Sequence, residues 1–462
     1  MVSLRRRLAI LCAKMAGVMI QKMSRRQGST FPGYIARLIY PDILADLAGM
    51  VREKIIVTMG TNGKTTVNNM VCHVLEQQGR KVIINRTGAN MLNGVICAFV
   101  MAAGWSGRLD ADYACMEVDE FAAEQILPGL KPACVLLTNI FRDQMDRYGE
   151  IDTVMFKIRT ALEGVPETKL VINGDDFFLN TLRLRCDHPA VTYGINEKIF
   201  EDASNPGVRE STFCRFCGEK LVFTFVQYGQ IGSYHCPRCS FRRPIPDHTV
   251  ENIRLEDGGY VYDMEGVQIQ IHTDAPYHVY NTLGAYGALK AVDAPVEGFA
   301  EAVRTFDYEN GREENFRLPN TKIQLYLAKN PIGFQQKIAL MVKDRKAKDL
   351  IVEINDTAQD GKDISWLWDV DIRYLKDANV ASVMVTGSRR LDMELRLKYE
   401  DILCRPAQDM QEAVKELLNG GTGNLYIIVN YSALYHTNHM LHQLQDVSAK
   451  DRSDKREKEV KS

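Results

Sequence analysis

The segment Lys54–Met70, KIIVTMGTNGKTTVNNM, constrains the fold more than any other part of the chain. It opens with a short apolar run typical of a buried strand and ends in the first turns of an amphipathic helix. Two glycines and a lysine–hydroxyl pair lie between these two elements. A strand, a glycine turn and a helix in this order predict an α/β fold whose first helix begins at an anion-binding turn.

The residues of this turn predict a site for the phosphates of a nucleoside triphosphate. Its glycines let backbone N–H groups approach phosphate oxygens, and the helix N-terminus adds its positive end. Lys64 is expected to reach the terminal phosphates, and Thr65 to bind Mg²⁺. An ordinary strand-to-helix turn is the alternative, because the common motif has a glycine where this chain has Thr58. The predicted binding residues are Gly60, Thr61, Asn62, Gly63, Lys64, Thr65 and Thr66.

At 462 residues the chain is too long for one hydrophobic core, so two or three domains are expected. The pattern predicts an N-terminal helical segment, a first α/β domain with a mostly parallel, doubly wound sheet, and a second, Rossmann-like α/β domain. GREENFRLPN (311–320) is interpreted as the linker. The predicted limits are 1–49, 50–316 with a cysteine-bearing insert at 205–247, 317–448, and a charged tail at 449–462.

Charge is nearly balanced, with 57 basic and 59 acidic side chains and a net charge of −2. The chain as a whole therefore has no electrostatic attraction to nucleic acid or to anionic lipid, and any such affinity must be local. A hydrophobic fraction of 45% and a charged fraction of 25% are those of an ordinary globular protein.

Residues 4–23 are predicted to form an amphipathic helix. Lys14 interrupts their apolar stretch and no small-residue cleavage site follows cleanly, so a signal peptide is not favoured. We interpret the helix as packed against the protein, in preference to the alternative of a helix on a membrane surface. The apolar stripe consists of Leu4, Leu8, Leu11, Met15, Val18 and Met19.

Two cysteine doublets predict a zinc ribbon. Cys214 and Cys217 are separated by two residues, as are Cys236 and Cys239, and eighteen residues lie between the doublets. Four thiolates on two tight turns close a tetrahedron around Zn²⁺ and leave no position for a catalytic water, so the ion is expected to be structural. A pair of redox-active motifs is the less favoured alternative.

Several segments together carry a family resemblance. They are GTNGKTT, MEVDE (116–120), TNIFRDQMDRYG (138–149), NGDD (173–176), HVYNTLGAYGA (278–288) and GREE (311–314). This combination resembles the ATP-dependent Mur ligases. The zinc-ribbon insert and the segment INDTAQDGKDISWLWDVD (354–371) narrow the resemblance to the MurT branch of that family.

The resemblance implies a Mur ligase-like ATP-binding domain and an amidation reaction. The α-carboxylate of D-glutamate in the stem peptide of lipid II would be activated with ATP and Mg²⁺ as an acyl phosphate, then attacked by ammonia. The ammonia would come from a GatD-like glutamine amidotransferase bound to the C-terminal domain as a heterodimer. The implied location is the cytoplasm, with a peripheral position at the inner face of the membrane left open, and nucleic acid is not an expected partner.

The resemblance also assigns roles to residues outside the turn. Glu117 is placed like a metal-binding carboxylate, and Lys157 aligns with the family's carbamylated lysine, which helps to hold a second Mg²⁺. Asn139 resembles an asparagine near the phosphates, and Asn281 resembles one that faces adenine. Arg312 resembles an arginine that contacts the nucleotide.

The source of ammonia can be argued from the cysteines. Outside the zinc set, most of them lie in apolar helices or strands and are expected to be small core residues rather than glutaminase nucleophiles. In the MurT branch, the second domain is thought to supply an aspartate that completes the Cys–His pair of the partner. Asp360 is the first candidate and Asp363 the second, although a DG turn aspartate also bonds its own backbone.

The sequence alone is also compatible with two other functions. One is a Mur-type ligase that adds an amino acid or glutamyl units and needs no ammonia. The other is a nucleotide-switched binding module for RNA or protein, against which the balanced charge and the few aromatic residues near the ribbon speak.

Overall fold

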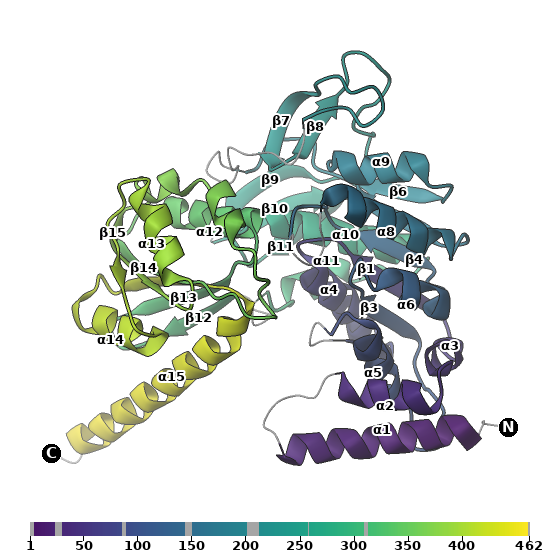
Figure 1. Cartoon of the computed structure of the whole chain (residues 1–462), viewed down its shortest axis with the longest axis horizontal. Coiled ribbons are helices and arrows are strands. Elements are labelled where there is room, and N and C mark those ends of the chain that lie inside the picture. The colour runs from purple at the N-terminus through teal and green to yellow at the C-terminus, as the bar shows by residue number, and fades with distance from the viewer. Residues whose placement is uncertain are drawn as a thin grey trace.

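The computed structural model describes residues 4–23, 30–85, 89–143, 150–200, 212–256, 258–308 and 313–460. Figure 1 shows two α/β lobes side by side, with helix α1 along the foot of the N-terminal lobe and helix α15 extending from the C-terminal lobe. The residues that bind or react are expected where these lobes meet, because clefts between domains are common ligand sites.

The N-terminal lobe is built on a six-stranded parallel sheet. The strand order is β2-β3-β1-β4-β5-β6, so β1 lies in the middle between β3 and β4. The chain changes direction across the sheet beside β1, and the carboxyl ends of strands at such a point border a crevice. The elements are β1 (Lys54–Met59), α4 (Lys64–Gln77), β2 (Val82–Ile84), α5 (Leu92–Ala102), β3 (Tyr113–Glu117), α6 (Ala123–Leu130), β4 (Cys134–Leu137), α8 (Ile151–Glu163), β5 (Lys169–Asn173), α9 (Phe177–Arg185) and β6 (Ala190–Tyr193).

Both faces of this sheet are buried. Ile55 and Val57 of β1 pack on one side with α5, α6 and α8, whereas Ile56 packs on the other side with α4 and α10 (Tyr277–Ala291). Successive side chains of a strand point to opposite faces, which explains the unbroken apolar run of β1. The predicted doubly wound α/β fold is confirmed.

Residues 212–304 extend the N-terminal lobe with antiparallel strands and two helices. The hairpin of β7 (Val222–Tyr228) and β8 (Ile231–His235) separates the two cysteine doublets. A three-stranded antiparallel sheet follows, in the order β11-β10-β9. Its strands are β9 (Glu251–Glu256), β10 (Gly259–Met264) and β11 (Val267–Ile271), and α10 and α11 (Phe299–Arg304) then pack against α4.

The C-terminal lobe contains a second six-stranded sheet, in the order β12-β13-β17-β14-β15-β16. Only β12 is antiparallel to its neighbour in this sheet, and the other neighbouring strands are parallel. Its elements are β12 (Glu313–Arg317), β13 (Lys322–Leu327), α12 (Pro331–Lys343), β14 (Lys348–Glu353), η2 (Ser365–Asp369), η3 (Ile372–Leu375), β15 (Val380–Thr386), α13 (Arg390–Lys398), β16 (Arg405–Pro406), α14 (Met410–Gly420), β17 (Asn424–Val429) and α15 (Tyr431–Val460).

Several local assignments add to or differ from the sequence interpretation. The expected linker contains β12, because Phe316 is buried against the second sheet and anchors an otherwise polar strand. Helix α6 begins at Ala123, after a turn in which the Asp119 carboxylate accepts the Phe121 N–H at 3.0 Å. Helix α9 and strand β6 were not predicted at all, and backbone helix continues through the predicted charged tail as far as Val460.

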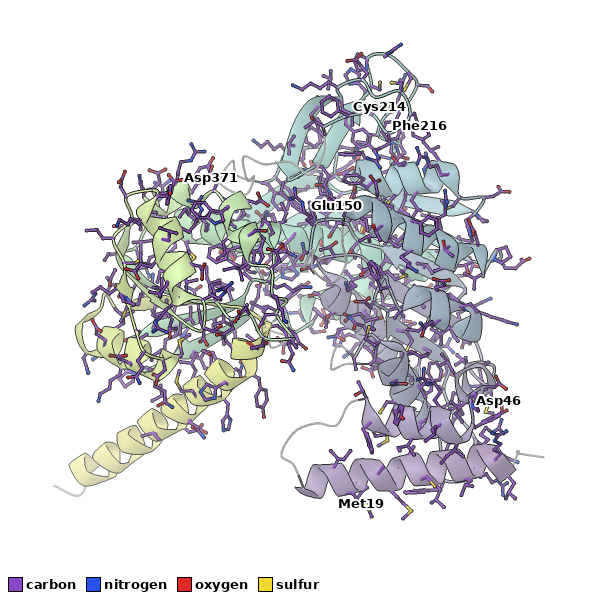
Figure 2. The ribbon with its side chains drawn as sticks, in the orientation of Figure 1. Met19, Asp46, Glu150, Cys214, Phe216 and Asp371 are labelled. Carbon is purple, nitrogen blue, oxygen red and sulfur yellow. The ribbon has the colours of Figure 1, made fainter. Side chains whose placement is uncertain are left out.

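The N-terminal segment forms α1 (Leu4–Met23), α2 (Phe31–Ile39) and α3 (Ile43–Ala48). The predicted helix is confirmed, but the prediction that its apolar stripe packs is wrong. Small residues such as Ala9 and Ala13 face the protein instead, and Lys14 Nζ donates to the Met101 carbonyl at 3.2 Å. Met19 points away from the lobe in Figure 2. Within the described ranges, no helix is both long enough and apolar enough to cross a membrane.

Candidate active site

The turn between β1 and α4 lies at the carboxyl edge of the central sheet. Gly60 has a φ of +121°, and a Cβ atom there would lie 2.3 Å from Thr138 Oγ1, so a larger residue does not fit. Gly63 precedes α4 with a φ of +84°, and no side chain caps the helix at this residue. The N–H groups in the first turn of α4 are therefore left for an anion.

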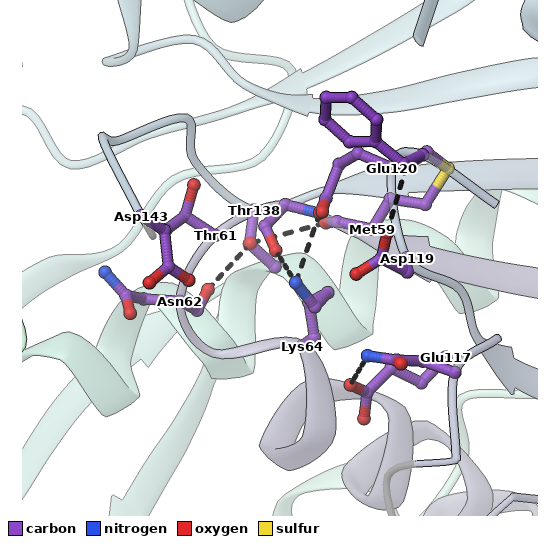
Figure 3. A network of polar contacts seen from close by, with 12 residues as sticks. Met59, Thr61, Asn62, Lys64, Glu117, Asp119, Glu120, Thr138 and Asp143 are labelled. Carbon is purple, nitrogen blue, oxygen red and sulfur yellow. Dashed lines mark hydrogen bonds and ion pairs between the residues drawn. The ribbon is translucent and has the colours of Figure 1, made fainter. Parts of the chain in front are cut away.

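Lys64 is buried beneath this turn and pairs with Glu120 (Figure 3). Its Nζ donates to the Gly60 carbonyl and lies 3.2 Å from Glu120 Oε1, which also accepts the Gly60 N–H at 2.6 Å. Burial lowers the pKa of Lys64, but the Glu120 and Glu117 carboxylates outweigh burial, so the pKa is raised and the ammonium stays charged. Burial also raises the pKa of Glu120.

Glu117 ends β3 directly beside the first helical turn. Thr65 Oγ1 donates to Glu117 Oε2 at 2.6 Å, and Asn90 Nδ2 donates to Oε1 at 3.1 Å. Asn85 holds the backbone of Glu117 through two hydrogen bonds of 2.9 and 2.8 Å. A carboxylate and a hydroxyl are the ligand types that Mg²⁺ prefers, so the two side chains predicted to bind the metal lie together.

Thr138 and Asn139 directly follow β4 and hold the turn through hydrogen bonds to Asn62. Asn139 Oδ1 accepts the Asn62 N–H at 2.9 Å, and Asn139 Nδ2 donates to the Asn62 carbonyl at 3.1 Å. Thr138 Oγ1 donates to the same carbonyl at 2.7 Å. Asn139 therefore fixes the backbone of Asn62, and its position near the phosphates stays a prediction from the resemblance.

A pocket of about 1010 Å³, open to solvent, adjoins the turn between the two lobes. Asn62, Gly63, Thr66 and Asn139 line it at the phosphate end. A nucleotide base needs apolar faces and a few polar atoms, and the remaining lining provides both. It includes Tyr193, Tyr228, Tyr277, His278, Tyr280, Asn281 and Tyr308 from the N-terminal lobe, and Leu327, Asn330, Ile332, Gln336 and Lys337 from the C-terminal lobe.

Asn281 and His278 lie on α10 at the wall of this pocket. A Cβ atom at Gly63 would be only 2.6 Å from Asn281 Oδ1, which places this amide against the turn. Asn281 Nδ2 lies 3.2 Å from His278 Nδ1. Burial lowers the pKa of His278 to about 4, so its ring is neutral at pH 7, and its buried Nε2 has no hydrogen-bond partner among the described residues.

Polar contacts join the two lobes around the pocket. Lys337 of α12 pairs with Glu313 of β12 within the C-terminal lobe, and its Nζ donates across the boundary to the Tyr277 hydroxyl of α10 at 2.7 Å. Lys329 pairs with Asp143 across the same boundary. The pocket is therefore bounded by two lobes that are held in register by charge-assisted contacts.

One residue assigned by resemblance does not line this pocket, and a second lies in a part of the chain that the structure does not describe. Lys157 lies on α8, where its half-buried Nζ is 3.3 Å from Glu124 Oε2 of α6, and it does not line the pocket. Arg312 lies outside the described residues.

Asp360 is buried in the C-terminal lobe and holds the start of α15. Its Oδ1 accepts the Ser432 N–H at 2.8 Å, and its Oδ2 accepts the Thr357 hydroxyl at 2.6 Å. Asp363 is more exposed and accepts the Ser365 N–H at 2.8 Å. Asp363 therefore bonds the backbone two residues further on, as a turn aspartate does, whereas Asp360 bonds a nearby hydroxyl and the distant backbone of α15.

The four predicted zinc ligands come together beside the β7–β8 hairpin. The Sγ atoms of Cys214, Cys217, Cys236 and Cys239 all lie within 4.8 Å of one another. Cys214 and Cys239 are 3.6 Å apart, and Cys217 and Cys236 are 3.4 Å apart. Zinc–sulfur bonds in a tetrahedron place the sulfurs about 3.8 Å apart, so the cluster fits the ion.

Sequence reasoning missed three polar groups of the site. Glu120 was within the quoted motif MEVDE, but its pairing with Lys64 was not predicted. Lys337 and Glu313 come from the C-terminal lobe, and only the three-dimensional arrangement brings them to the pocket. A buried cation such as Lys64 requires a carboxylate partner, and this requirement was the available signal.

Comparison with known proteins supports the same picture. The Mur ligase middle domain family matches residues 57–235, and the MurT ligase C-terminal family matches residues 327–434. The lipid II isoglutaminyl synthase (glutamine-hydrolyzing) subunit MurT of Staphylococcus aureus (strain COL) is 32% identical over 394 residues, which cover 85% of this chain and 88% of that protein. The subunit of the same name from Streptococcus pneumoniae is 28% identical, and the match covers 96% of this chain and 99% of that protein.

Solved structures show the same fold at low sequence identity. MurF from Acinetobacter baumannii has a TM-score of 0.65 at 15% identity and covers 89% of this chain and 81% of its own. A pseudomurein peptide ligase type C from Methanothermus fervidus has a TM-score of 0.64 at 19% identity, and the match covers 86% of this chain and 80% of that one.

The glycine turn, its two glutamates and the cleft between two α/β lobes define an ATP-dependent ligase of the Mur type. Identity of 32% to the Staphylococcus aureus subunit, over most of both chains, also assigns the family within this class. The chain belongs to the MurT family.

Proposed function

We propose that this chain amidates the α-carboxylate of D-glutamate in the stem peptide of lipid II, with ATP and with ammonia from a GatD-like glutaminase. The observation that carries the proposal is the open phosphate turn, with Lys64 beneath it and Thr65 beside Glu117, facing the cleft between the lobes. Both MurT relatives are subunits of a glutamine-hydrolysing lipid II isoglutaminyl synthase, which supports the proposed acceptor and the proposed second subunit.

In this proposal, each group at the turn has a defined task. The Lys64 ammonium and the first N–H groups of α4 neutralise the phosphoryl oxygens of ATP. Thr65 and Glu117 hold Mg²⁺, which offsets the negative charge of the β- and γ-phosphates. Asn281 and the aromatic residues of the pocket bind the base.

The chemistry proceeds in two displacements. A carboxylate oxygen of the substrate attacks the γ-phosphorus, the bond to the bridging oxygen of ADP breaks, and an acyl phosphate forms. Ammonia then attacks the carbonyl carbon, the C–O bond to phosphate breaks, and one ammonia proton leaves with the phosphate. The protein contributes position and charge rather than a covalent nucleophile.

Two further residues belong to the proposed nucleotide site on the strength of the family resemblance. Lys157, as its carbamate, would help to hold a second Mg²⁺, and Arg312 would contact the nucleotide. Since Lys157 is paired with Glu124, carbamylation would exchange an attractive contact for a repulsive one and require this pair to separate.

The cysteines support a separate source of ammonia. Burial raises the pKa of Cys134 to about 12 and that of Cys186 to about 11, and it holds Cys115 in the thiol form as well. A glutaminase nucleophile needs a lowered pKa or an adjacent base, so these thiols are poor candidates. In the proposal, Asp360, or failing it Asp363, completes the Cys–His pair of the partner.

A reaction with purified components tests the proposal. The chain and its glutaminase partner are incubated with lipid II, ATP, Mg²⁺ and glutamine, and the product is weighed by mass spectrometry. Amidation lowers the mass by about one dalton, whereas addition of an amino acid raises it by a whole residue. Lys64→Ala is expected to reduce turnover by about 10²–10³-fold, and Lys322→Ala, an exposed lysine at the start of β13, is the matched control. Undiminished turnover by Lys64→Ala would refute it.

We also propose that the cysteine cluster binds a structural Zn²⁺. Metal analysis should find one zinc per chain, and Cys236→Ser should lose it. Because none of the four cysteines lines the pocket, ATP binding should survive removal of the ion. Absence of zinc from protein purified without chelators would contradict this.

Lipid II is a membrane lipid, so the proposal places the chain in the cytoplasm at the inner face of the membrane.

A further inference from the structure

Helix α1 presents its bulky apolar side chains to solvent. Leu4 is 83% exposed, Met19 is 59% exposed, and Leu8 and Met15 are each 50% exposed. Leu11 and Val18 lie on the same stripe and are exposed as well. A continuous apolar stripe along a twenty-residue helix costs free energy in water, and such patches mark interaction sites.

The opposite face of α1 accounts for its attachment to the protein. Ala9, Ile10 and Ala13 are fully buried against α2 and α5, and a Cβ atom at Gly17 would lie 3.4 Å from Pro32. Small residues permit this close approach of helices. The stripe is therefore not required to hold α1 in place, and it remains available to an external partner.

The charge around the stripe identifies the kind of partner. Residues 1–41 contain eight arginines and lysines and neither aspartate nor glutamate, although the whole chain has a net charge of −2. Arg5 and Arg7 are exposed on α1 itself. Trp105 is 65% exposed beside α1, with Lys14 Nζ 5.2 Å from its ring centroid. Basic residues and tryptophan next to an apolar stripe are typical of helices that lie in a lipid interface.

We propose that α1 lies in the surface of an anionic lipid bilayer, with its apolar stripe at the acyl boundary and its arginines among the phosphate headgroups. This docking surface adds to the proposed function a way to hold the enzyme beside a membrane-anchored substrate, and it relies on that function only for this purpose. A second copy of the chain is a poorer occupant, because two segments that each carry eight positive charges and no negative ones repel each other.

Vesicle flotation with the full-length chain tests the inference without ATP, glutamine or lipid II. The protein should bind vesicles of phosphatidylglycerol and phosphatidylcholine, and binding should fall at high salt and with pure phosphatidylcholine. Leu8→Asp combined with Met15→Asp should weaken binding by at least about 100-fold, because each substitution removes a half-exposed apolar side chain from the lipid and adds a charge. Leu403→Asp, at a residue 92% exposed in the C-terminal lobe, should bind like the parent chain.

A second measurement locates the contact. Lipids brominated near the headgroup should quench tryptophan fluorescence of the parent chain, and Trp105→Phe should abolish most of this quenching. Equal binding by the double aspartate variant, or no binding to anionic vesicles, would overturn the proposal. So would a dimer in lipid-free buffer that the double variant converts to a monomer. Because lipid II is absent from this assay, a negative result would leave the proposed amidation intact.

Discussion

Three helices of this protein follow parallel strands, yet they begin in different ways. In the C-terminal lobe, Asn330 Oδ1 accepts the Gly333 N–H at 2.8 Å at the start of α12, and the Asp360 carboxylate accepts the Ser432 N–H at the start of α15. In the N-terminal lobe, α4 begins at Gly63 with no side-chain acceptor. The same connection is thus a structural cap where a side chain fills the first turn and an anion site where glycine leaves it open.

The strongest test of this contrast is Gly63→Ala. A methyl group there would meet Asn281 Oδ1 at 2.6 Å, and its φ of +84° is unfavourable for alanine. ATP affinity, measured by calorimetry with Mg²⁺, is expected to fall about 10³-fold. Gly79→Ala is the matched control, because Gly79 also has a positive φ but has open space around it. Similar affinities for the two variants would show that backbone strain, and not the open turn, decides binding.

A second test concerns how the stability of the protein depends on pH through His278, which lines the pocket. His278 has a folded pKa of about 4 against an ordinary value of 6.5, so the unfolded chain takes up the proton first as the pH falls. The resulting loss of stability should begin near pH 6.5 and reach about 3 kcal/mol near pH 4. Urea denaturation of the parent chain and of His278→Gln at several pH values would measure it. The variant should lose less stability than the parent over this interval, and identical pH profiles would contradict the prediction.

A smaller effect is expected at the start of α15, where a side chain fills the first turn. Asp360→Ala removes the acceptor for Ser432 N–H and should destabilise the C-terminal lobe by about 1–2 kcal/mol in urea denaturation. Asp360→Asn keeps an acceptor oxygen and should lose less. If Asp360 also serves the partner's Cys–His pair, both variants should lower glutaminase activity in the complex, whereas Asp363→Ala should not. Full glutaminase activity in Asp360→Asn would limit this residue to its capping role.

Local patterns predicted the parts of the site that are close in sequence. The order of strand, glycine turn and helix located Gly60 to Thr66, and the cysteine spacing located a cluster that fits zinc, because such features depend on a few consecutive residues. The doubly wound sheet followed from the alternation of strands and helices.

Features that depend on distant contacts were not predictable in the same way. Helical spacing showed that Leu4 to Met19 share one face of α1, but it cannot say which face is buried, and here the small residues pack. Strand β12 has one buried apolar residue, Phe316, so its polar sequence resembled a linker. Lys337 meets Glu313 only when the C-terminal lobe has folded, and it meets Tyr277 only when the two lobes come together.

The Glu120 carboxylate has a consequence for selectivity at the turn. It already satisfies the Lys64 ammonium and the Gly60 amide, so arrival of a nucleotide is an exchange of one anion for another. In the proposed site, a triphosphate that also contacts Mg²⁺ and the base pocket would displace the Glu120 carboxylate from Lys64. If the turn binds ATP as proposed, inorganic phosphate alone would offer little beyond the contacts that Glu120 already makes, and it would compete poorly for the site.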